Sequence, residues 1–305
     1  MEIYRNLSGI CETKRNVDLR EYCSIKIGGK GRFVCFPKTV SQVKKLIMFL
    51  TRTKVKYYVL GNGTNIIFED VGYSGVLICL KKMNRVVIKN EKVSAYAGVN
   101  LFYLNKLCAY AGLSGLEFSY GIPGSVGGAV CMNAGAFGGE MKDVVKFVWV
   151  LKDGRVQKLK SEELKFGYRT SILQKNKMIV LKVQFRLKQE SKDNLVQNIA
   201  KNNNILQNMQ QILQKRLSSQ PYGTLNAGSI FKKTHNESAG KYIDKLGLKG
   251  VTIEHIQISQ IHANFFINLG GATSKNMHKV IDITKEKVQN EFGVILEQEV
   301  IFVGD

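Results

Sequence analysis

The chain has 305 residues and carries 45 Lys and Arg against 24 Asp and Glu, a formal net charge of +21 at pH 7. Hydrophobic residues make up 44% of it, which is typical of a globular protein with a full core, and no apolar run reaches the roughly 18 residues of a membrane helix. The length allows two or three domains of roughly 100–150 residues each. The charge favours first a lysine-rich solvated surface, then a phosphate-bearing ligand, and only third a nucleic-acid binder, because no recognition motif accompanies it.

The N-terminal stretch MEIYRNLSGICETKRNVDLREYC has scattered charges and lacks the apolar segment of a signal peptide. We therefore expect a soluble, cytoplasmic protein. The six cysteines are dispersed without a C-x-x-C pair, which is typical of small buried hydrophobic residues. The four histidines show no metal-ligand spacing, so we expect no metal.

In chain order, the first predicted helix spans residues 43–50, where apolar side chains recur at helical spacing. Strands are then predicted at 57–60, 75–80 and 93–99, followed by a helix over about 100–111. A strand at 144–151, a hairpin turn at Lys152-Asp153-Gly154 and a cleanly alternating strand at 179–187 come next. Many strands with few helices between them predict an α+β fold rather than a doubly wound sheet.

The composition changes at Gln189, after which Gln, Asn and Lys predominate. Apolar residues at helical spacing between 195 and 217 predict an amphipathic helix that separates two domains and ends before Pro221. Beyond it, strands at 252–259 and 263–269, a helix over about 274–292 and a strand at 294–303 predict a second α+β unit.

Two glycine-rich segments each adjoin a predicted strand: Gly61-Asn62-Gly63-Thr64-Asn65, and the stretch 121–140, GIPGSVGGAVCMNAGAFGGE. Glycine has no Cβ and tolerates positive φ, so backbone N–H groups can crowd around an anion. Neither segment fits a common template, because Ile66 stands where a dinucleotide fingerprint has its third glycine, and no G-x-x-x-x-G-K-[ST] exists. On residue types alone, simple turns and a site for a large phosphate ligand both stay open.

Longer motifs carry a family resemblance. LGNGTNIIFED resembles the L-G-x-G-[ST]-N segment of the UDP-N-acetylenolpyruvoylglucosamine reductases (MurB), and GLEFSYGIPGSVGGAVCMNAGAFGGEMKD is similar to their longest motif almost residue for residue. The segments GYRTS at 167–171, NAGSIFKK around Ser229, HANFFIN at 262–268 and the closing LEQEVIFVG match as well. The matches run in order from about Ile25 to the C-terminus, and the long glycine motif is highly specific.

The resemblance implies a flavoenzyme of bacterial peptidoglycan synthesis. FAD would be held noncovalently in a two-part α+β module of the vanillyl-alcohol-oxidase/PCMH type, with a C-terminal α+β substrate domain. NADPH would reduce the flavin, and hydride would then pass to the enolpyruvyl ether of UDP-N-acetylglucosamine to give UDP-N-acetylmuramate. The expected division is 1–60 and 61–195 for the FAD module and 196–305 for the substrate domain. The expected partners are this sugar nucleotide and NADPH, with no nucleic acid and no membrane span, in a monomer.

The resemblance also assigns roles to residues. Hydride arriving on the enolpyruvyl terminal carbon pushes negative charge toward the substrate carboxylate, and that charge needs fixed donors in a dry site. Arg169 and Glu299 match the arginine and the protonated glutamate that serve this purpose, and Ser229 matches the serine that protonates the neighbouring carbon. Tyr168, Lys232 and Lys233 are expected to bind the substrate, the lysines through its diphosphate. The expected cofactor-binding residues are Gly61, Asn62, Gly63, Thr64, Asn65, Gly121, Pro123, Gly124, Ser125, Gly127, Gly128, Asn133, Ala134 and Gly135.

Without the resemblance these catalytic residues would not stand out. A glutamate on a terminal strand is usually solvated, a lone arginine is usually a surface residue, and a serine after Ala-Gly is typical of a turn or helix cap. The glycine segments differ, because their residue types favour an anionic ligand before any family is named.

Three positions depart from the family pattern. Glu254-His255 stands where two glycines are usual, Lys233 where an asparagine is common, and Cys23 where a threonine usually precedes Ser24. These departures bear on a loop of the substrate domain, a nucleotide contact and the expected flavin edge, respectively. None of them touches the three expected catalytic residues.

Three other functions stay open at this point: a flavin oxidase on the same module, a nucleotide or nucleic-acid binder without redox activity, and an inactive family member. The presence of Ser229 and Glu299 argues against the last. One flavin cradle without a second dinucleotide fingerprint predicts that NADPH and the sugar nucleotide use the same site in turn, which means ping-pong kinetics.

Overall fold

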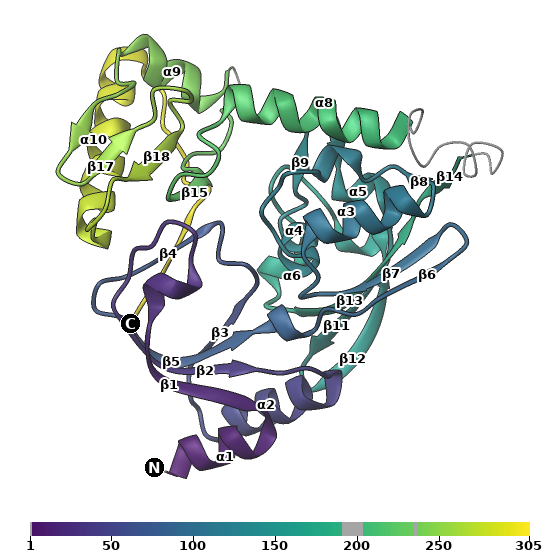
Figure 1. The fold of residues 1–305 in the computed structure, drawn as a ribbon. Coiled ribbons are helices and arrows are strands. Elements are labelled where there is room, and N and C mark those ends of the chain that lie inside the picture. The colour runs from purple at the N-terminus through teal and green to yellow at the C-terminus, as the bar shows by residue number, and fades with distance from the viewer. Residues whose placement is uncertain (1, 191–203, 235–236) are drawn as a thin grey trace. The chain divides into compact units, whose positions relative to one another are not determined.

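The computed structural model of the chain describes residues 2–190, 204–234 and 237–305 (Figure 1). The chain divides into two compact units. Unit 1 comprises residues 1–13, 35–62 and 78–215, and unit 2 comprises residues 14–34, 63–77 and 216–305. The expected domain boundary at 195/196 lies outside the described residues, and the boundary at 60/61 stays a prediction.

The N-terminal part of the chain forms helices α1 (Glu2–Ile10) and α2 (Val40–Arg52), which pack against each other, and a four-stranded sheet. The sheet has the order β1 (Glu12–Asp18), β2 (Lys30–Phe36), β5 (Tyr73–Cys79), β3 (Tyr57–Leu60). The helix predicted at 43–50 is confirmed as the centre of α2, where it buries Val43, Leu46, Ile47 and Leu50. The Thr39 side chain caps α2 by accepting a hydrogen bond from the backbone N–H of Gln42.

Unit 1 is built around a five-stranded antiparallel sheet of order β12-β11-β13-β7-β6. The strands are β6 (Val86–Lys89), β7 (Lys92–Tyr96), β11 (Val145–Lys152), β12 (Arg155–Lys160) and β13 (Ile179–Arg186). The predicted alternation in β13 is confirmed, because Ile179, Leu181, Val183 and Phe185 are buried. The predicted hairpin turn is also confirmed: Asp153 and Gly154 join β11 to β12 with φ of 48° and 73°.

Helices of unit 1 cover the apolar face of this sheet. Within the glycine stretch, α4 (Val126–Cys131) packs against β7 and β13 (Figure 1). Beside it run α3 (Leu101–Tyr110), the hairpin β9 (Gly135–Ala136) and β10 (Gly139–Glu140), α5 (Met141–Val144) and α6 (Ile172–Lys175). A two-stranded pair joins β8 (Leu113–Ser114) to β14 (Lys188–Gln189), and single turns of 3₁₀ helix lie at Leu80–Lys82, Glu117–Ser119 and Ser161–Leu164.

The predicted amphipathic helix appears as α8 (Asn204–Ser219), and residues 195–203 of the prediction lie outside the described residues. Ile205 and Met209 of α8 form a buried cluster with Ala109 and Tyr120, and Tyr120 stacks on Phe102 with ring centroids 4.8 Å apart. The helix therefore contributes its apolar face to the core of unit 1.

The C-terminal part of unit 2 is an α+β layer. Its four-stranded sheet has the order β15 (Asn226–Ser229), β18 (Phe265–Asn268), β17 (Ile256–Ile258), β16 (Thr252–Ile253). Helix α10 (Ser274–Phe292) packs against β17 and against α9 (Ala239–Lys245). The predicted bounds of α10 are confirmed, with a capping box of Thr273 and Asn276 at its start and left-handed Gly293 at its end.

Two strand predictions in unit 2 are wrong. The strand expected at 252–259 is a hairpin, because Glu254 adopts a left-handed φ of 53° and turns the chain between β16 and β17. The strand expected at 294–303 is confined to β19 (Ile301–Val303), which pairs in parallel with β4 (Ile66–Phe68). Residues 297–300, which precede β19, run beside residues 230–232 of unit 2 instead. A short 3₁₀ turn at Leu19–Tyr22 completes this unit.

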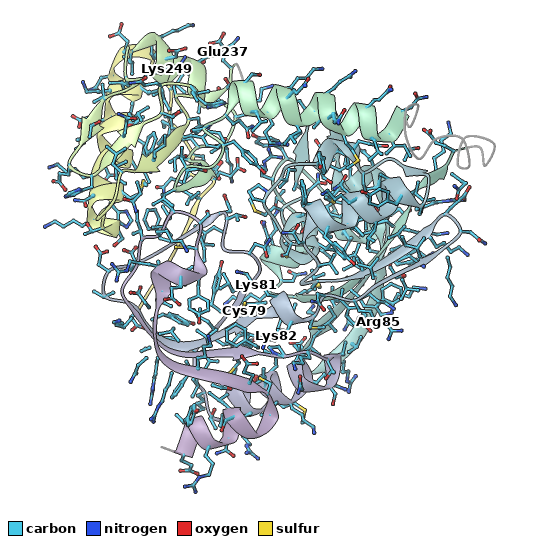
Figure 2. The ribbon with its side chains drawn as sticks, viewed as in Figure 1. Cys79, Lys81, Lys82, Arg85, Glu237 and Lys249 are labelled. Atoms are coloured by element: carbon cyan, nitrogen blue, oxygen red, sulfur yellow. The ribbon has the colours of Figure 1, made fainter. Side chains whose placement is uncertain are left out.

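Charged side chains occur throughout both units. Figure 2 shows Lys81 and Lys82 beside Cys79 at the end of β5, and burial raises the pKa of the Cys79 thiol although both lysines favour its thiolate. No helix in the described part of the chain is long and apolar enough to cross a membrane. Within the same residues, no cluster of three or more His, Cys, Asp or Glu side chains could hold a metal ion.

Candidate functional site

Gly61 and Asn62, the part of the first glycine segment that belongs to unit 1, contact the second segment. A Cβ on Gly61 would lie 2.5 Å from the Ser125 Oγ, and the Asn62 side-chain amide donates a hydrogen bond to the Pro123 carbonyl at 3.4 Å. Ser125 caps α4, because its Oγ accepts a hydrogen bond from the Gly128 N–H. Residue 61 must therefore lack a side chain for its backbone to lie this close to Ser125.

The glycines of the stretch 121–140 do not all have the same role in the structure. Gly127 donates its N–H to the Ala97 carbonyl at 2.8 Å, and a Cβ there would lie 2.8 Å from the Ala97 Cβ. This glycine therefore lets α4 pack directly on the backbone of the sheet, which is a structural purpose. Its expected contact with the cofactor stays a prediction.

The structure offers backbone donors to an anion. Among the described residues, no acceptor is found for the N–H groups of Asn62, Gly124 and Ser125 in unit 1, nor, separately, for those of Gly63 and Thr64 in unit 2. Backbone donors without an internal acceptor are what a pyrophosphate group requires. The residues present therefore fit the diphosphate of FAD.

Arg169 lies at the tip of a tight turn in unit 1, near the end of the glycine stretch. Its Nη2 donates a hydrogen bond to the Gly135 carbonyl at 3.2 Å, and its guanidinium lies 5.1 Å from the centroid of the exposed Tyr168 ring. Asn133 and Glu140 lie in the same neighbourhood and are joined by a hydrogen bond of 2.7 Å. Ala134 is held by the backbone, because its N–H donates to the Ala129 carbonyl.

Ser229 and Glu299 come together in unit 2. Residues 297–300 run antiparallel to 230–232: the Glu299 N–H donates to the Ile230 carbonyl at 2.8 Å, and Phe231 pairs with Gln298. Ser229 is the last residue of β15, and both it and Glu299 are partly exposed. The serine and the glutamate that the resemblance singles out, 70 residues apart in the sequence, thus lie on neighbouring segments.

The first glycine segment continues into the same part of unit 2. The Asn65 side-chain amide donates to the Glu299 carbonyl at 3.1 Å, and the Ile301 N–H donates to the Asn65 carbonyl at 3.1 Å. Ser24 connects this segment to the strand of Ser229, because its N–H donates to the Gly63 carbonyl and its Oγ to the Asn226 carbonyl. The structure therefore joins Gly63–Asn65, Ser229 and Glu299 by backbone contacts.

The expected substrate lysines differ in their surroundings. Lys232 forms an ion pair with Glu297 and donates its backbone N–H to the Glu297 carbonyl at 2.8 Å. Lys233, the departure from the usual asparagine, has an exposed side chain. Their contacts with a diphosphate stay predictions.

The other two departures have local explanations. Cys23 is buried, its thiol donates to the Ile27 carbonyl at 3.3 Å, and burial raises the pKa of this thiol. Glu254 occupies a left-handed turn position that favours glycine, and its carboxylate bonds to Asn276 and to the Lys279 Nζ of α10. Lys279 is also the main reason that the pKa of Glu254 is lowered.

Sequence reasoning missed Asn264 and Asn268 in the HANFFIN segment. The buried Asn264 side chain bonds to both the N–H and the carbonyl of Phe231, and thereby fixes the segment that follows Ser229. Asn268 donates to the Ile25 carbonyl at 2.9 Å and so holds the loop of Ser24. The available signal was an amide-bearing residue inside a short apolar strand, which must find partners if it is buried.

Comparisons with known proteins point to one family. A family model described as UDP-N-acetylenolpyruvoylglucosamine reductase, C-terminal domain, matches residues 220–303, and one described as FAD binding domain matches residues 32–160. Proteins named UDP-N-acetylenolpyruvoylglucosamine reductase from Caldicellulosiruptor bescii and Clostridioides difficile are 37% and 35% identical over 100% of this chain and 94% and 98% of their own. The crystal structure of the enzyme of that name from Thermus caldophilus aligns with a TM-score of 0.78 at 34% identity, covering 96% of this chain and 98% of its own.

Proposed function

Because the chain belongs to the UDP-N-acetylenolpyruvoylglucosamine reductase family, we propose that it reduces the enolpyruvyl ether of UDP-N-acetylglucosamine to UDP-N-acetylmuramate, with FAD as its cofactor and NADPH as its reductant. The observation that carries the proposal is the pairing of the Ser229 and Glu299 segments next to the glycine segment at Gly63–Asn65. The matches of the FAD binding domain model to residues 32–160 and of the reductase C-terminal domain model to residues 220–303 support it further. We also propose that the enzyme acts in the cytoplasm and as a monomer.

Bound FAD would supply the two-electron hydride chemistry that amino-acid side chains lack. The N–H groups of the two glycine segments would hold its diphosphate, and the mostly uncharged stretch 121–135 would limit competition from water. The proposed cofactor contacts thus come chiefly from backbone atoms, which accounts for the glycines better than a side-chain site would.

The side chains would manage the charge and the proton that hydride transfer demands of the substrate. Hydride adds to the terminal carbon, electrons of the carbon–carbon double bond move toward the carboxylate, and Arg169 and Glu299 would stabilise that charge. Ser229 would then give its hydroxyl proton to the neighbouring carbon and regain one from solvent, which completes reduction of the double bond. Lys232 would leave Glu297 for the substrate diphosphate, where its compact ammonium group can act as a point charge.

Replacement of Ser229 by Ala tests this assignment, because it removes the proton donor and leaves the glycine segments intact. We expect oxidation of NADPH by the flavin to keep its rate within about twofold, while reduction of the sugar nucleotide falls by about 10²- to 10⁴-fold. Stopped-flow absorbance of the flavin, first with NADPH alone and then with the enolpyruvyl substrate, separates the two half-reactions.

Ser259→Ala is the matched control, since Ser259 is a buried serine of unit 2 whose Oγ only caps the backbone N–H groups of Ile261 and His262. Both half-reactions should survive it. If Ser229→Ala slowed both half-reactions equally, the proton-donor role would be lost. A reduced protein that reacts rapidly with oxygen but not with the sugar nucleotide would instead indicate an oxidase.

A further inference from the structure

We propose that Asn133 and Glu140, at the end of the glycine stretch, are positioning residues that hold Arg169 in its working geometry. The inference rests on the proposed role of Arg169 and adds how the chain places its guanidinium. Both residues act through the backbone that surrounds Arg169.

The backbone of Arg169 needs such support. Gly167 and Thr170 close a two-residue turn with reciprocal N–H to carbonyl bonds of 3.0 and 3.3 Å, and Arg169 stands in it with a φ of 53°. The left-handed conformation is unfavourable for a residue with a Cβ, because the Cβ approaches the following carbonyl oxygen. Strain of this kind persists where surrounding contacts impose it, and it gathers at functional sites.

Asn133 supplies the first of these contacts. Its side chain is fully buried, and its Nδ2 donates both to the Gly167 carbonyl at 3.0 Å and to the Glu140 Oε2 at 2.7 Å. Its Oδ1 accepts from the Lys142 N–H at 2.9 Å. The amide group thus donates one hydrogen bond to Gly167, the residue that starts the Arg169 turn, and one to Glu140, which supports a positioning role for this side chain.

Glu140 supplies the second contact. It pairs across the β9–β10 hairpin with Gly135, whose carbonyl accepts the hydrogen bond from Arg169. A Cβ on Gly135 would lie 2.7 Å from the Glu140 Cγ, so this side chain packs on the peptide that receives the guanidinium. Lys142, 3.0 Å away, is the main cause of the lowered pKa of Glu140, and Asn133 and the charge of Arg169 act in the same direction. The carboxylate therefore stays negative beside the arginine.

Asn133→Gly deletes the first contact without backbone strain, because glycine accepts the φ of 45° found at Asn133. Asn90→Gly is the matched control: the same change at a left-handed asparagine (φ 51°) in the β6–β7 turn of unit 1. For Asn133→Gly we expect hydride transfer to the sugar nucleotide, measured per bound flavin, to slow by about 10- to 100-fold relative to the parent. The control should match the parent in every respect.

The Glu140 variants test the second contact and remain informative if Asn133→Gly does not fold. Glu140→Gln keeps an acceptor for Asn133 and should lose no more than about fivefold in hydride transfer, whereas Glu140→Ala should approach the loss of Asn133→Gly. Equal losses in the two Glu140 variants would contradict the hydrogen-bond link through Asn133.

A double-mutant cycle with Arg169→Ala separates positioning from general stability. If Asn133 acts through Arg169, its removal costs nothing further once the guanidinium is gone, whereas a merely structural asparagine would give additive losses. Hydrogen exchange on the flavin-free protein gives an independent readout: the Thr170 amide should exchange at least about tenfold faster in Asn133→Gly and unchanged in Asn90→Gly.

The outcomes distinguish this inference from the function on which it rests. Additive losses in the cycle, or parental hydride transfer in Asn133→Gly while Arg169→Ala is slow, overturn the positioning role alone. Parental hydride transfer in Arg169→Ala overturns the proposed role of Arg169 and the inference with it.

Discussion

Gly63 shows why residues without a side chain are needed in the glycine segments. At Gly63 a Cβ would lie 2.0 Å from the Tyr22 carbonyl oxygen, and the φ of 69° is one that glycine adopts freely. The Gly63 carbonyl also accepts a hydrogen bond from the Ser24 N–H. Gly63 therefore fixes the turn of the first glycine segment, and this turn places Asn65 next to Glu299.

Replacement of Gly63 by Ala should lower the free energy of unfolding by about 2 kcal/mol more than replacement of Gly154 by Ala. Gly154 has a similar φ of 73° but nothing within 4 Å of its would-be Cβ, so it carries only the conformational penalty of about 1–2 kcal/mol. Urea unfolding of both flavin-free variants measures the difference, and flavin retention gives a second readout. Equal destabilisation would show that crowding at Tyr22 is relieved by a small backbone shift.

The sequence predicted the need for bare backbone here but not the reason at each position. Residue types favour an anion for the whole stretch 121–140, yet Gly127 lacks a side chain because α4 rests on Ala97, a neighbour that lies 30 residues away in the sequence. The expected cofactor contact of Asn133 stays a prediction, and the sequence did not reveal that its amide bonds to Gly167 and Glu140. Local patterns indicate a site, but contacts distant in sequence assign the purpose of each residue in it.

Among the elements, regular periodicity was predictable and turn chemistry was not. The spacing of apolar residues located α2, α10 and β13 to within a few residues. The β16–β17 hairpin was not predicted. Its left-handed turn residue, Glu254, is held by Asn276 and Lys279 of α10, and no local sequence signal reveals these contacts. The pairing of residues 297–300 with the Ser229 segment was missed for the same reason, since nothing local tells a strand where it changes partner.

Helix α8 gives a prediction at this scale. Met209 is 2% exposed and lies in the cluster with Tyr120, so Met209→Ala should lower the free energy of unfolding by about 2–4 kcal/mol. Gln210→Ala, at the next and exposed position, should change it by no more than about 0.5 kcal/mol. Urea unfolding followed by near-ultraviolet circular dichroism reports on the stacked Phe102–Tyr120 pair. Equal stabilities of the two variants would mean that α8 contributes little to the core of unit 1.

At the scale of the whole molecule, the charge of +21 is opposite in sign to that of the proposed substrates. The proposed function gives the protein two substrates, NADPH and a sugar diphosphate, that are both multiply negative. A net positive field raises the local concentration of anions and the rate at which they arrive, and added salt screens it over about 10 Å at 0.1 M. The positive charge spread over both units therefore raises the rate at which the substrates reach the protein. The glycine segments and Arg169 act once a substrate is bound.

We accordingly expect kcat/KM for NADPH and for the sugar nucleotide to fall by about 3- to 10-fold when KCl rises from about 20 to about 300 mM, with kcat changed by less than about twofold. Steady-state kinetics at several salt concentrations measure this, and an uncharged osmolyte such as sucrose controls for water activity and viscosity. A parallel fall of kcat would place the salt effect on a bound state, and no fall of kcat/KM would leave the excess of lysine without a part in substrate capture. In the second case the surface charge would serve solubility alone, and the anion recognition of this enzyme would lie wholly in its bare backbone and few fixed side chains.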